Sequence, residues 1–233
     1  MSDALPIVLI PGLACTPRLY AEQIAPLWTL GPVTIAQHAR HDSMAEIAQA
    51  ILASAPQRFA LVGLSMGGYI GFEILRQAPE RVAKLALLDT SARPDTQEQT
   101  ENRRLQIGLT EKTRMADLAD ALFSRLVPAR RAGDERLRGI VRTMAEETGA
   151  AGFIRQQTAI MHRPDSRPDL GAIRCPTLVL VGRDDELTPP DRAEEMAHGI
   201  AGARLVVLPE CGHLSTLERP AEVTAALMAW LAG

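Results

Sequence analysis

Six short apolar runs, separated by longer stretches with helical periodicity, limit the folds open to this chain more than any other feature. The runs cover residues 7–10, 33–36, 59–62, 85–88, 177–181 and 205–208. Each is mainly apolar along its length rather than alternating, which is typical of strands covered on both faces. The sequence therefore predicts an α/β fold, with a mostly parallel sheet of about six strands flanked by helices.

Helix start signals lie between these runs. Pro17 follows a threonine, Ser43 precedes Glu46 by three residues in the pattern of a capping box, and Pro190 and Pro220 each precede an amphipathic segment. Proline is favoured in the first turn of a helix, and serine is a preferred N-terminal cap. We therefore expect crossover helices to begin at these four places.

The interval 91–170 interrupts the alternation of strands and helices. It holds no convincing strand, but it contains helical patterns such as MADLADALFSRL at 115–126 and RLRGIVRTMAEE at 136–147. A long segment of this kind between two strands indicates a helical insertion. We expect a core made of residues 1–90 and 171–233, with residues 91–170 forming a cap or lid.

Composition and charge exclude several classes of protein. Hydrophobic residues make up 46% and charged residues 23% of the 233, as in an ordered globular protein. The net charge of −3 predicts no nucleic-acid partner, and no apolar run approaches the roughly 20 residues of a membrane span. Without a basic leader, and with three scattered cysteines in no metal-binding pattern, we expect a cytoplasmic protein with no disulfide framework and no metal.

The stretch GLSMG at 63–67 places a serine between two glycines. This pattern alone is equally compatible with an ordinary turn. The alternative is a tight bend from a strand into a helix, in which the serine is strained and exposed as a nucleophile. Gly63 and Gly67 would then lie where a Cβ atom has no room. Since a serine hydroxyl needs a base and a group that orients the base, the interpretation depends on the rest of the chain.

Two later loops supply a carboxylate and a histidine. GRDDELTPP follows the run at 177–181 and contains Asp184 and Asp185, and CGHLSTLERP follows the run at 205–208 and contains His213. Both lie where parallel strands end, at the edge where sites gather in such sheets. Spacing alone does not separate the two aspartates. Asp89, at the end of the run 85–88, is a further candidate, although a hydrogen bond to loop backbone is its more ordinary role.

Together with LIPG at 9–12 and GLSMGG at 63–68, these motifs make the chain resemble the α/β-hydrolase superfamily over nearly its whole length. The resemblance implies a serine hydrolase without cofactor and with a cap over the nucleophile. It also implies a triad and an oxyanion hole formed by two backbone N–H groups, which we assign as follows: Ser65, Asp185 and His213 form the triad, and Leu13 and Met66 give the N–H groups. The family often has a histidine at the position of Pro11, so the support of the oxyanion loop is open.

Several residues are candidates for contact with substrate. Tyr20 is expected near the pocket, where a role in the core is equally reasonable. On the insertion, Arg125, Arg155 and Arg163 are candidates for binding a substrate carboxylate, with a solvent-exposed surface charge as the alternative for each. His162 is the remaining candidate for a lid contact.

These observations favour a hydrolase of a small ester, lactone or thioester that forms an acyl-enzyme on Ser65. Its partner would be a small-molecule acyl substrate. A lyase or C–C bond enzyme of the same fold, with the triad as a general base, is an alternative, and so is a non-catalytic binding protein. The sequence does not identify the substrate or the oligomeric state.

Overall fold

A computed structural model describes residues 4–233 and contains one six-stranded sheet in which all paired strands are parallel. The strands are β1 (Ile7–Ile10), β2 (Val33–Ile35), β3 (Phe59–Leu64), β4 (Val82–Leu88), β5 (Thr177–Gly182) and β6 (Arg204–Leu208). Their order across the sheet is β2-β1-β3-β4-β5-β6. The predicted fold class is confirmed. Residues 1–3 of the expected core lie outside the described residues.

Strand β4 begins three residues before the predicted run. The prediction started too late because Lys84 interrupts the apolar pattern. The Lys84 ammonium donates to the carbonyl oxygens of Trp230 and Leu231, at 3.0 and 2.8 Å. These carbonyls belong to the last turn of α9 (Pro220–Ala232), where carbonyl groups lack partners within the helix. A lysine within the sheet therefore caps a helix instead of marking the end of a strand.

The two faces of the sheet divide the core by alternation along the strands. In β1, the side chains of Ile7 and Leu9 belong to one apolar cluster, and those of Val8 and Ile10 belong to the other. Strands β3, β4 and β5 divide in the same way. Since successive side chains point to opposite faces, continuous apolar runs supply both layers at once.

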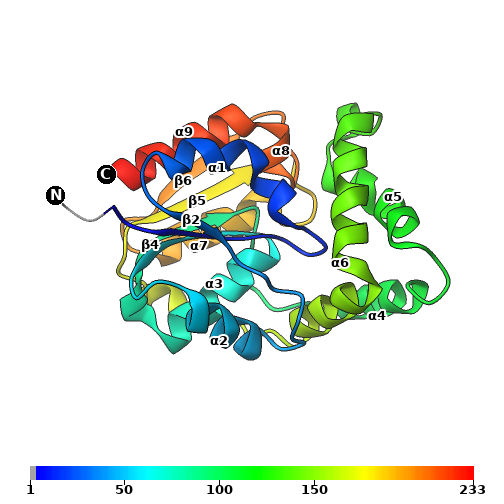
Figure 1. The fold of residues 1–233 in the computed structure, drawn as a ribbon, viewed down its shortest axis with the longest axis horizontal. Coiled ribbons are helices and arrows are strands. Elements are labelled where there is room, and N and C mark those ends of the chain that lie inside the picture. The colour runs from blue at the N-terminus through cyan, green and yellow to red at the C-terminus, as the bar shows by residue number, and fades with distance from the viewer. Residues whose placement is uncertain (1–3) are drawn as a thin grey trace.

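Helices cover both faces (Figure 1). Their bounds are α1 (Ala21–Trp28), α2 (Met44–Ser54), α3 (Met66–Gln77), α7 (Pro190–Gly199), α8 (Ser215–Glu218) and α9. Helices α1, α8 and α9 pack on one face, and α2, α3 and α7 pack on the other. Among the described residues, no helix combines the length and the apolar character that a membrane crossing requires.

The predicted helix starts are mostly found. Helices α7 and α9 begin at Pro190 and Pro220, but Pro17 begins a 3₁₀ turn, Pro17–Tyr20, that leads into α1. The Ser43 hydroxyl accepts from the backbone N–H of Glu46 at 3.2 Å, while the Glu46 carboxylate lies 4.0 Å from the His41 ring. The serine cap is confirmed, and the glutamate half of the predicted capping box is directed elsewhere.

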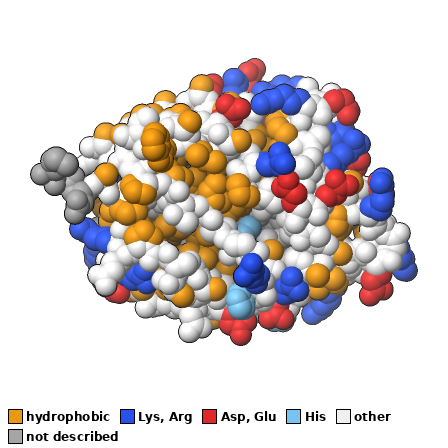
Figure 2. All heavy atoms as spheres, in the orientation of Figure 1, with side chains coloured by type: hydrophobic (Ala, Val, Ile, Leu, Met, Phe, Trp, Pro, Cys, Tyr) orange, Lys and Arg blue, Asp and Glu red, His pale blue; other side chains and the backbone are white. Residues whose placement is uncertain are grey.

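Three helices lie between β4 and β5: α4 (Gln97–Leu109), α5 (Met115–Leu126) and α6 (Glu135–Met161). Figure 1 shows them beyond the carboxyl ends of the strands, at the right of the view, and Figure 2 shows charged side chains gathered on that part of the surface. Helix α6 is broken at Gly149, whose φ of 69° and ψ of 163° are far from helical values. Glycine accepts this conformation without steric cost. The break gives α6 two limbs.

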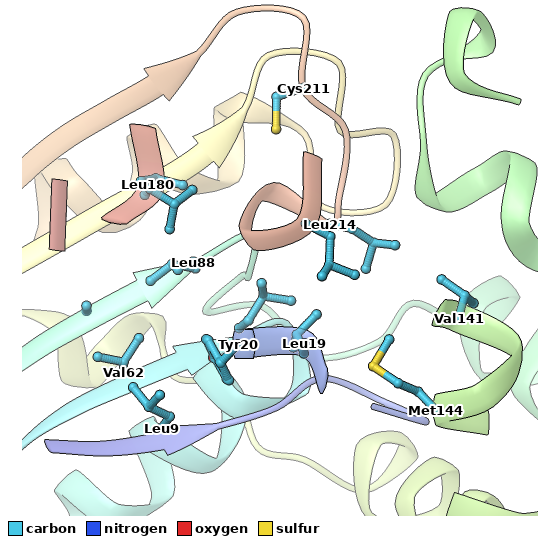
Figure 3. Close-up of a cluster of buried hydrophobic side chains, with 14 of the residues drawn as sticks. Leu9, Leu19, Tyr20, Val62, Leu88, Val141, Met144, Leu180, Cys211 and Leu214 are labelled. Atoms are coloured by element: carbon cyan, nitrogen blue, oxygen red, sulfur yellow. The ribbon is translucent and has the colours of Figure 1, made fainter. Parts of the chain in front are cut away.

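Side chains from the sheet and from α6 belong to one apolar cluster (Figure 3). Leu88 and Leu180 project from neighbouring strands, and Leu214 lies between them and Val141 and Met144 of α6. The helical segment is thus attached to the sheet by buried apolar contacts over the carboxyl ends of the strands.

The connection from β3 to α3 is so tight that two glycines have no room for a side chain, as predicted. A Cβ atom on Gly63 would lie 2.3 Å from the carbonyl oxygen of Gly67, and a Cβ atom on Gly67 would lie 2.1 Å from the carbonyl oxygen of Ile10. Both neighbours are backbone atoms, which cannot turn aside as a flexible side chain can. The bend and the first strand can therefore pack this closely only because glycine has no side chain.

We expect Gly67→Ala to lower the free energy of unfolding by about 3 kcal/mol, because the added methyl group forces β1 and α3 apart. Gly71→Ala on the same helix is the matched control. Its Cβ would meet only the side chains of Leu61 and Leu85, at 3.6 and 4.0 Å, and alanine favours helix. Denaturant unfolding of both variants checks the difference. Equal stability of the two variants would contradict the steric account.

Candidate active site

Ser65 occupies the bend between β3 and α3 with a φ of 54° and a ψ of −114°. Its N–H donates to the carbonyl of Leu88 at 2.9 Å, and its carbonyl accepts from the Thr90 hydroxyl at 2.7 Å. A positive φ is strained for a serine and persists only where the surroundings enforce it. These bonds, together with the two glycines, fix the backbone so that the hydroxyl stands at the edge of the sheet.

His213 and Asp185 meet the Ser65 hydroxyl in a continuous line of hydrogen-bonding groups. The Nε2 atom of His213 lies 2.9 Å from the Ser65 Oγ, and its Nδ1 atom lies 2.8 Å from Oδ2 of Asp185. The imidazole and the carboxylate are almost completely buried. The structure therefore brings the three predicted triad residues together, although 148 positions separate Ser65 from His213 in the chain.

The loop after β5 determines which aspartate faces the histidine. The backbone N–H groups of Leu187 and Thr188 donate to Oδ1 of Asp185, at 2.9 and 3.0 Å, and the Thr188 hydroxyl donates to Oδ2 at 2.7 Å. Asp184 instead pairs with Arg130 at 2.6 Å on the surface. Asp185 is therefore the carboxylate that can orient the His213 ring.

Asp89, the further candidate for the acid, forms hydrogen bonds to residues outside the triad. It accepts from the N–H of Gly182 at 3.0 Å and from the hydroxyl of Ser215. Burial, with the nearby charge of Asp185, raises the pKa of Asp89. It ties the end of β4 to the end of β5 and to α8, beneath the site.

The charges of the site favour an ionised Asp185 beside a basic His213. Burial opposes the imidazolium, but the charge and hydrogen bond of Asp185 outweigh it and raise the pKa of His213 above its usual 6.5. Burial also opposes the ionised carboxylate of Asp185. The charge and hydrogen bond of His213, together with the hydrogen bonds from Thr188, outweigh burial and lower the pKa of Asp185. Such a pair can take a proton from Ser65 and hold it as an imidazolium.

Two backbone N–H groups beside the serine have no partner among the described residues. Neither the N–H of Leu13 nor that of Met66 donates a hydrogen bond to any residue in 4–233. A Cβ atom on Gly12 would lie 3.4 Å from the Ser65 Cβ, so the loop after β1 passes directly beside the serine. This is the arrangement that stabilises an oxygen on which negative charge develops.

The support of this loop, left open by Pro11, comes from two distant residues. The Nε2 atom of His38 lies 3.0 Å from the Gly12 carbonyl oxygen and 3.1 Å from the side-chain nitrogen of Gln156. The side-chain oxygen of Gln156 accepts from the N–H of Ala14 at 3.0 Å. Burial lowers the pKa of His38 to about 4, so the ring is neutral.

This support controls the direction of the Leu13 N–H. The carbonyl of Gly12 and the N–H of Leu13 belong to one planar trans peptide and point in opposite directions. His38 and the N–H of Cys15, at 3.2 Å, hold the carbonyl on one side. The N–H of Leu13 is thereby directed to the other side, and Gln156 fixes the next peptide.

Glu218 holds the backbone on both sides of His213. It accepts from the N–H of Gly212 at 3.0 Å and from the N–H of Leu214 at 3.1 Å. Burial raises the pKa of this carboxyl group. This role of Glu218 was not predicted, although the residue lies within the motif CGHLSTLERP at 211–220.

A cavity of about 320 Å³ opens beside Ser65 and His213. Leu13, Arg125 and Arg163, three of the predicted site residues, also line it. Much of its wall comes from apolar side chains of α5 and α6, namely Met115, Leu118, Ala119, Leu122, Val141, Met144, Ala145 and Phe153. The volume lies within the range of small-molecule sites.

Three substrate-binding candidates lie outside this cavity. Tyr20 is fully buried and donates its hydroxyl to the carbonyl of Ile10 at 2.9 Å. Arg155 donates to the carbonyl of Ala39 at 2.8 Å, and His162 is exposed beside the carbonyl of Thr158. Arg155 and His162 are seven positions apart and share a side of α6, whereas the cavity lies along the side of Phe153 and Ile160. The side chain of Met66 is likewise in the core, and only its N–H faces the site.

Gln156 and His38 were missed because their role depends on contacts between distant parts of the chain. Gln156 lies 142 positions from Ala14 and 118 from His38. The one signal present in the sequence is periodicity, since Gln156 falls three and four positions from the apolar Phe153 and Ile160. A glutamine on the buried side of a helix requires a buried partner.

Comparison with known proteins gives a consistent family. A model described as the alpha/beta hydrolase family matches residues 7–227. A pimeloyl-[acyl-carrier protein] methyl ester esterase from Nitrosomonas europaea is 27% identical over 188 residues, which cover 77% of this chain and 73% of that protein.

Solved structures are similar over the whole fold. A thermophilic esterase from Thermogutta terrifontis superposes with a TM-score of 0.89 at 30% identity, covering 99% of this chain and 90% of that one. The enol-lactonase from Burkholderia xenovorans gives a TM-score of 0.89 at 27% identity, covering 100% and 93%.

The raised pKa of His213 generates a prediction about pH. Since the base works only when neutral, kcat/KM for ester hydrolysis should rise with pH through a midpoint above 6.5. Asp185→Asn should lower kcat by about ten thousandfold and move this midpoint downward, because the charge that favours the imidazolium is lost. Asp184→Asn is the control and should keep the midpoint. A midpoint that is unchanged in Asp185→Asn but shifted in Asp184→Asn would contradict the assignment.

The contact of Gln156 with the loop generates a second prediction. Gln156→Leu should lower kcat by about tenfold or more with little change in KM, because the loop that carries Leu13 loses its orientation while the cavity wall stays. Gln156→Glu, which keeps an oxygen for the Ala14 N–H, should recover part of the loss. Thr158→Val, which loses only a bond to the carbonyl of Ile154 on the same helix, is the control. A parallel fall in kcat and thermal stability for both Gln156→Leu and Thr158→Val would show a structural role only.

Proposed function

Since the chain belongs to the alpha/beta hydrolase family, we propose that it is a serine hydrolase of small carboxylic esters, lactones or thioesters. In this proposal Ser65 carries the acyl group, His213 is the general base and acid, and Asp185 orients the imidazole. The N–H groups of Leu13 and Met66 bind the oxyanion.

One observation carries the proposal. The hydrogen-bonded line from Asp185 through His213 to Ser65 ends at the wall of a cavity, beside two N–H groups without partners in the described chain. A nucleophile, a base, a group that orients the base and an electrostatic binding place for the developing charge are the four parts that acyl transfer requires.

The first half of the reaction forms the acyl-enzyme. The Ser65 oxygen attacks the acyl carbonyl carbon while its proton passes to Nε2 of His213. The carbonyl electron pair moves to the oxygen, which the N–H groups of Leu13 and Met66 stabilise; such a donor contributes about 3 kcal/mol in other enzymes. When the carbonyl re-forms, the bond to the leaving group breaks, and the leaving oxygen or sulfur takes the proton from Nε2.

The second half returns the free serine. His213 takes a proton from a water molecule, and the resulting hydroxide attacks the acyl carbon to give the same oxyanion geometry. Collapse releases the carboxylic acid, and the proton on Nε2 returns to the Ser65 oxygen. Asp185 keeps the imidazole in one orientation through both halves, because its carboxylate accepts from Nδ1.

The relatives support hydrolysis of this kind. The similar proteins include a methyl ester esterase, a thermophilic esterase and an enol-lactonase, all of which cleave an acyl–oxygen bond. We also propose that residues 91–170 act as the cap of this enzyme. Their helices supply most of the apolar cavity wall over the candidate nucleophile, which limits the size and shape of the acyl group.

A fluorophosphonate probe tests the nucleophile. We expect the probe to attach covalently to the wild-type protein at Ser65 with loss of fluoride, and not to attach to Ser65→Ala, as measured by intact and peptide mass spectrometry. Ser91→Ala is the control, because Ser91 lines the same cavity and its hydroxyl accepts from the backbone N–H of Arg93. Labelling that persists in Ser65→Ala would refute the role of Ser65.

Turnover of 4-nitrophenyl butyrate extends this test. Ser65→Ala should lower kcat by a thousandfold or more while the folded state persists in circular dichroism. A burst of 4-nitrophenolate, with a butyryl adduct of the protein trapped by acid quench, is expected from an acyl-enzyme. Turnover without any adduct would instead favour use of the triad as a general base that activates water for direct attack on the ester.

A further inference from the structure

Arg163 is a buried arginine whose guanidinium is only partly used by the protein. It is 8% exposed, and it lines the cavity that contains Ser65. Its Nε donates to the carbonyl of Arg93 at 3.1 Å, and its Nη1 donates to Asp95 at 2.6 Å and to the carbonyl of Ile160 at 3.0 Å. Its Nη2 donates to no residue among 4–233. A guanidinium nitrogen at a cavity wall can bind a ligand that accepts hydrogen bonds.

The charges around Arg163 do not balance. Asp95 is also the partner of Arg103, whose Nε lies 2.6 Å from the other carboxylate oxygen. The side chain of Asp95 is 1% exposed and that of Arg163 is 6% exposed, so both charges are removed from water. Two arginines share one carboxylate, which leaves one positive charge in excess. An excess charge in a cluster removed from water is costly, and an anion in the cavity would offset that cost.

Tyr69 connects this excess charge to the candidate nucleophile. The guanidinium carbon of Arg163 lies 4.2 Å from the centre of the Tyr69 ring, which is a cation–π contact. Tyr69 is one helical turn after Ser65, and its N–H donates to the Ser65 carbonyl at 3.4 Å. Tyr69 also lines the cavity, and its hydroxyl has no hydrogen-bond partner in the described part of the chain. Two side chains that each have an unused donor are thus in contact at the cavity wall.

The other charged groups of the cavity wall have partners or are exposed. Arg93 pairs with Glu195 at 2.9 Å, and Arg192 pairs with Asp191 at 3.0 Å. Arg125 and Glu186 also line the cavity, but both are exposed, so solvent screens their charges. The uncompensated buried charge is therefore specific to the Arg103–Asp95–Arg163 cluster.

We propose that Arg163 and Tyr69 form a carboxylate-binding subsite within the cavity, so that the preferred substrates are esters or lactones that carry a second, ionised carboxyl group. The excess of a single charge fits a carboxylate better than a doubly charged phosphate. The apolar wall from α5 and α6 would accommodate a hydrocarbon spacer between the carboxylate and the scissile bond. The statement that the substrates are esters or lactones rests on the proposed hydrolase function. The carboxylate-binding subsite itself does not rest on it.

Matched substrates test the subsite in turnover. We compare the mono-4-nitrophenyl esters of glutaric, adipic and suberic acid with the corresponding carboxamides, which have the same shape without the charge. At one or more chain lengths the wild-type kcat/KM should favour the acid by about tenfold or more. The ratio should fall to about one in Arg163→Met and fall partly in Tyr69→Phe, which keeps the ring and removes only the hydroxyl. Arg125→Met should keep the ratio.

A binding measurement makes the test independent of catalysis. By calorimetry with the Ser65→Ala protein, hexanoate should bind at least about tenfold more tightly than hexanamide, and adding Arg163→Met should remove this preference. If Arg163→Met does not fold, Tyr69→Phe carries both measurements, since its hydroxyl has no partner within the described residues.

The outcomes separate the two proposals. Hydrolysis of acid and amide at equal kcat/KM, with equal affinity for hexanoate and hexanamide, would overturn the subsite and leave the hydrolase intact. A preference for hexanoate that requires Arg163, with no ester turned over, would support the subsite and refute the hydrolase. A preference that survives Arg163→Met, or that disappears in Arg125→Met, would overturn the assignment to Arg163.

Discussion

The close contact of β1, β3 and α3 behind Ser65 is the constraint on which the rest of the site depends. With Gly63 and Gly67 in the bend, backbone atoms meet where side chains would otherwise stand, and Ser65 is left with a positive φ. This one geometry has two results, because it raises the hydroxyl above the sheet edge and frees the N–H of Met66. Ala14 and Asp89, which flank the serine on neighbouring loops, are two of only three further non-glycine residues with positive φ in 4–233. Backbone strain is gathered around the site.

Each of the other groups of the site is held in place by a hydrogen bond to a buried polar side chain. Glu218 fixes the backbone around His213, Thr188 fixes Asp185, and Gln156 with His38 fixes the loop that carries Leu13. These contacts remove freedom before any ligand arrives, which is what an electrostatic site needs, since dipoles already in place do not have to reorganise. The helical segment takes part in this arrangement through Gln156 and is more than a cover.

The sequence predicted the sheet well because strands buried on both faces need continuous apolar runs. Because parallel strands end at one edge, it also predicted that Ser65, His213 and an aspartate of the loop after β5 would meet, and the family resemblance selected Asp185 over Asp184. It failed at Lys84, whose charge is used at the end of a distant helix. It also failed for Arg155 and His162, since residue type alone does not give the side of a helix that faces a cavity. Gln156 could not be predicted, because its role arises only when α6 reaches the loop after β1.

The break at Gly149 divides α6 into two limbs that contribute differently to the site. The limb before it carries Val141, Met144 and Ala145 on the cavity wall, and the limb after it carries Phe153 and Ile160 on the same wall together with Gln156. Substitutions in the first limb would change part of the cavity wall and leave the contact of Gln156 with the loop after β1 in place. The residues that shape one side of the cavity and the residue that holds the backbone beside Ser65 thus lie on different limbs of one helix, with Gly149 between them.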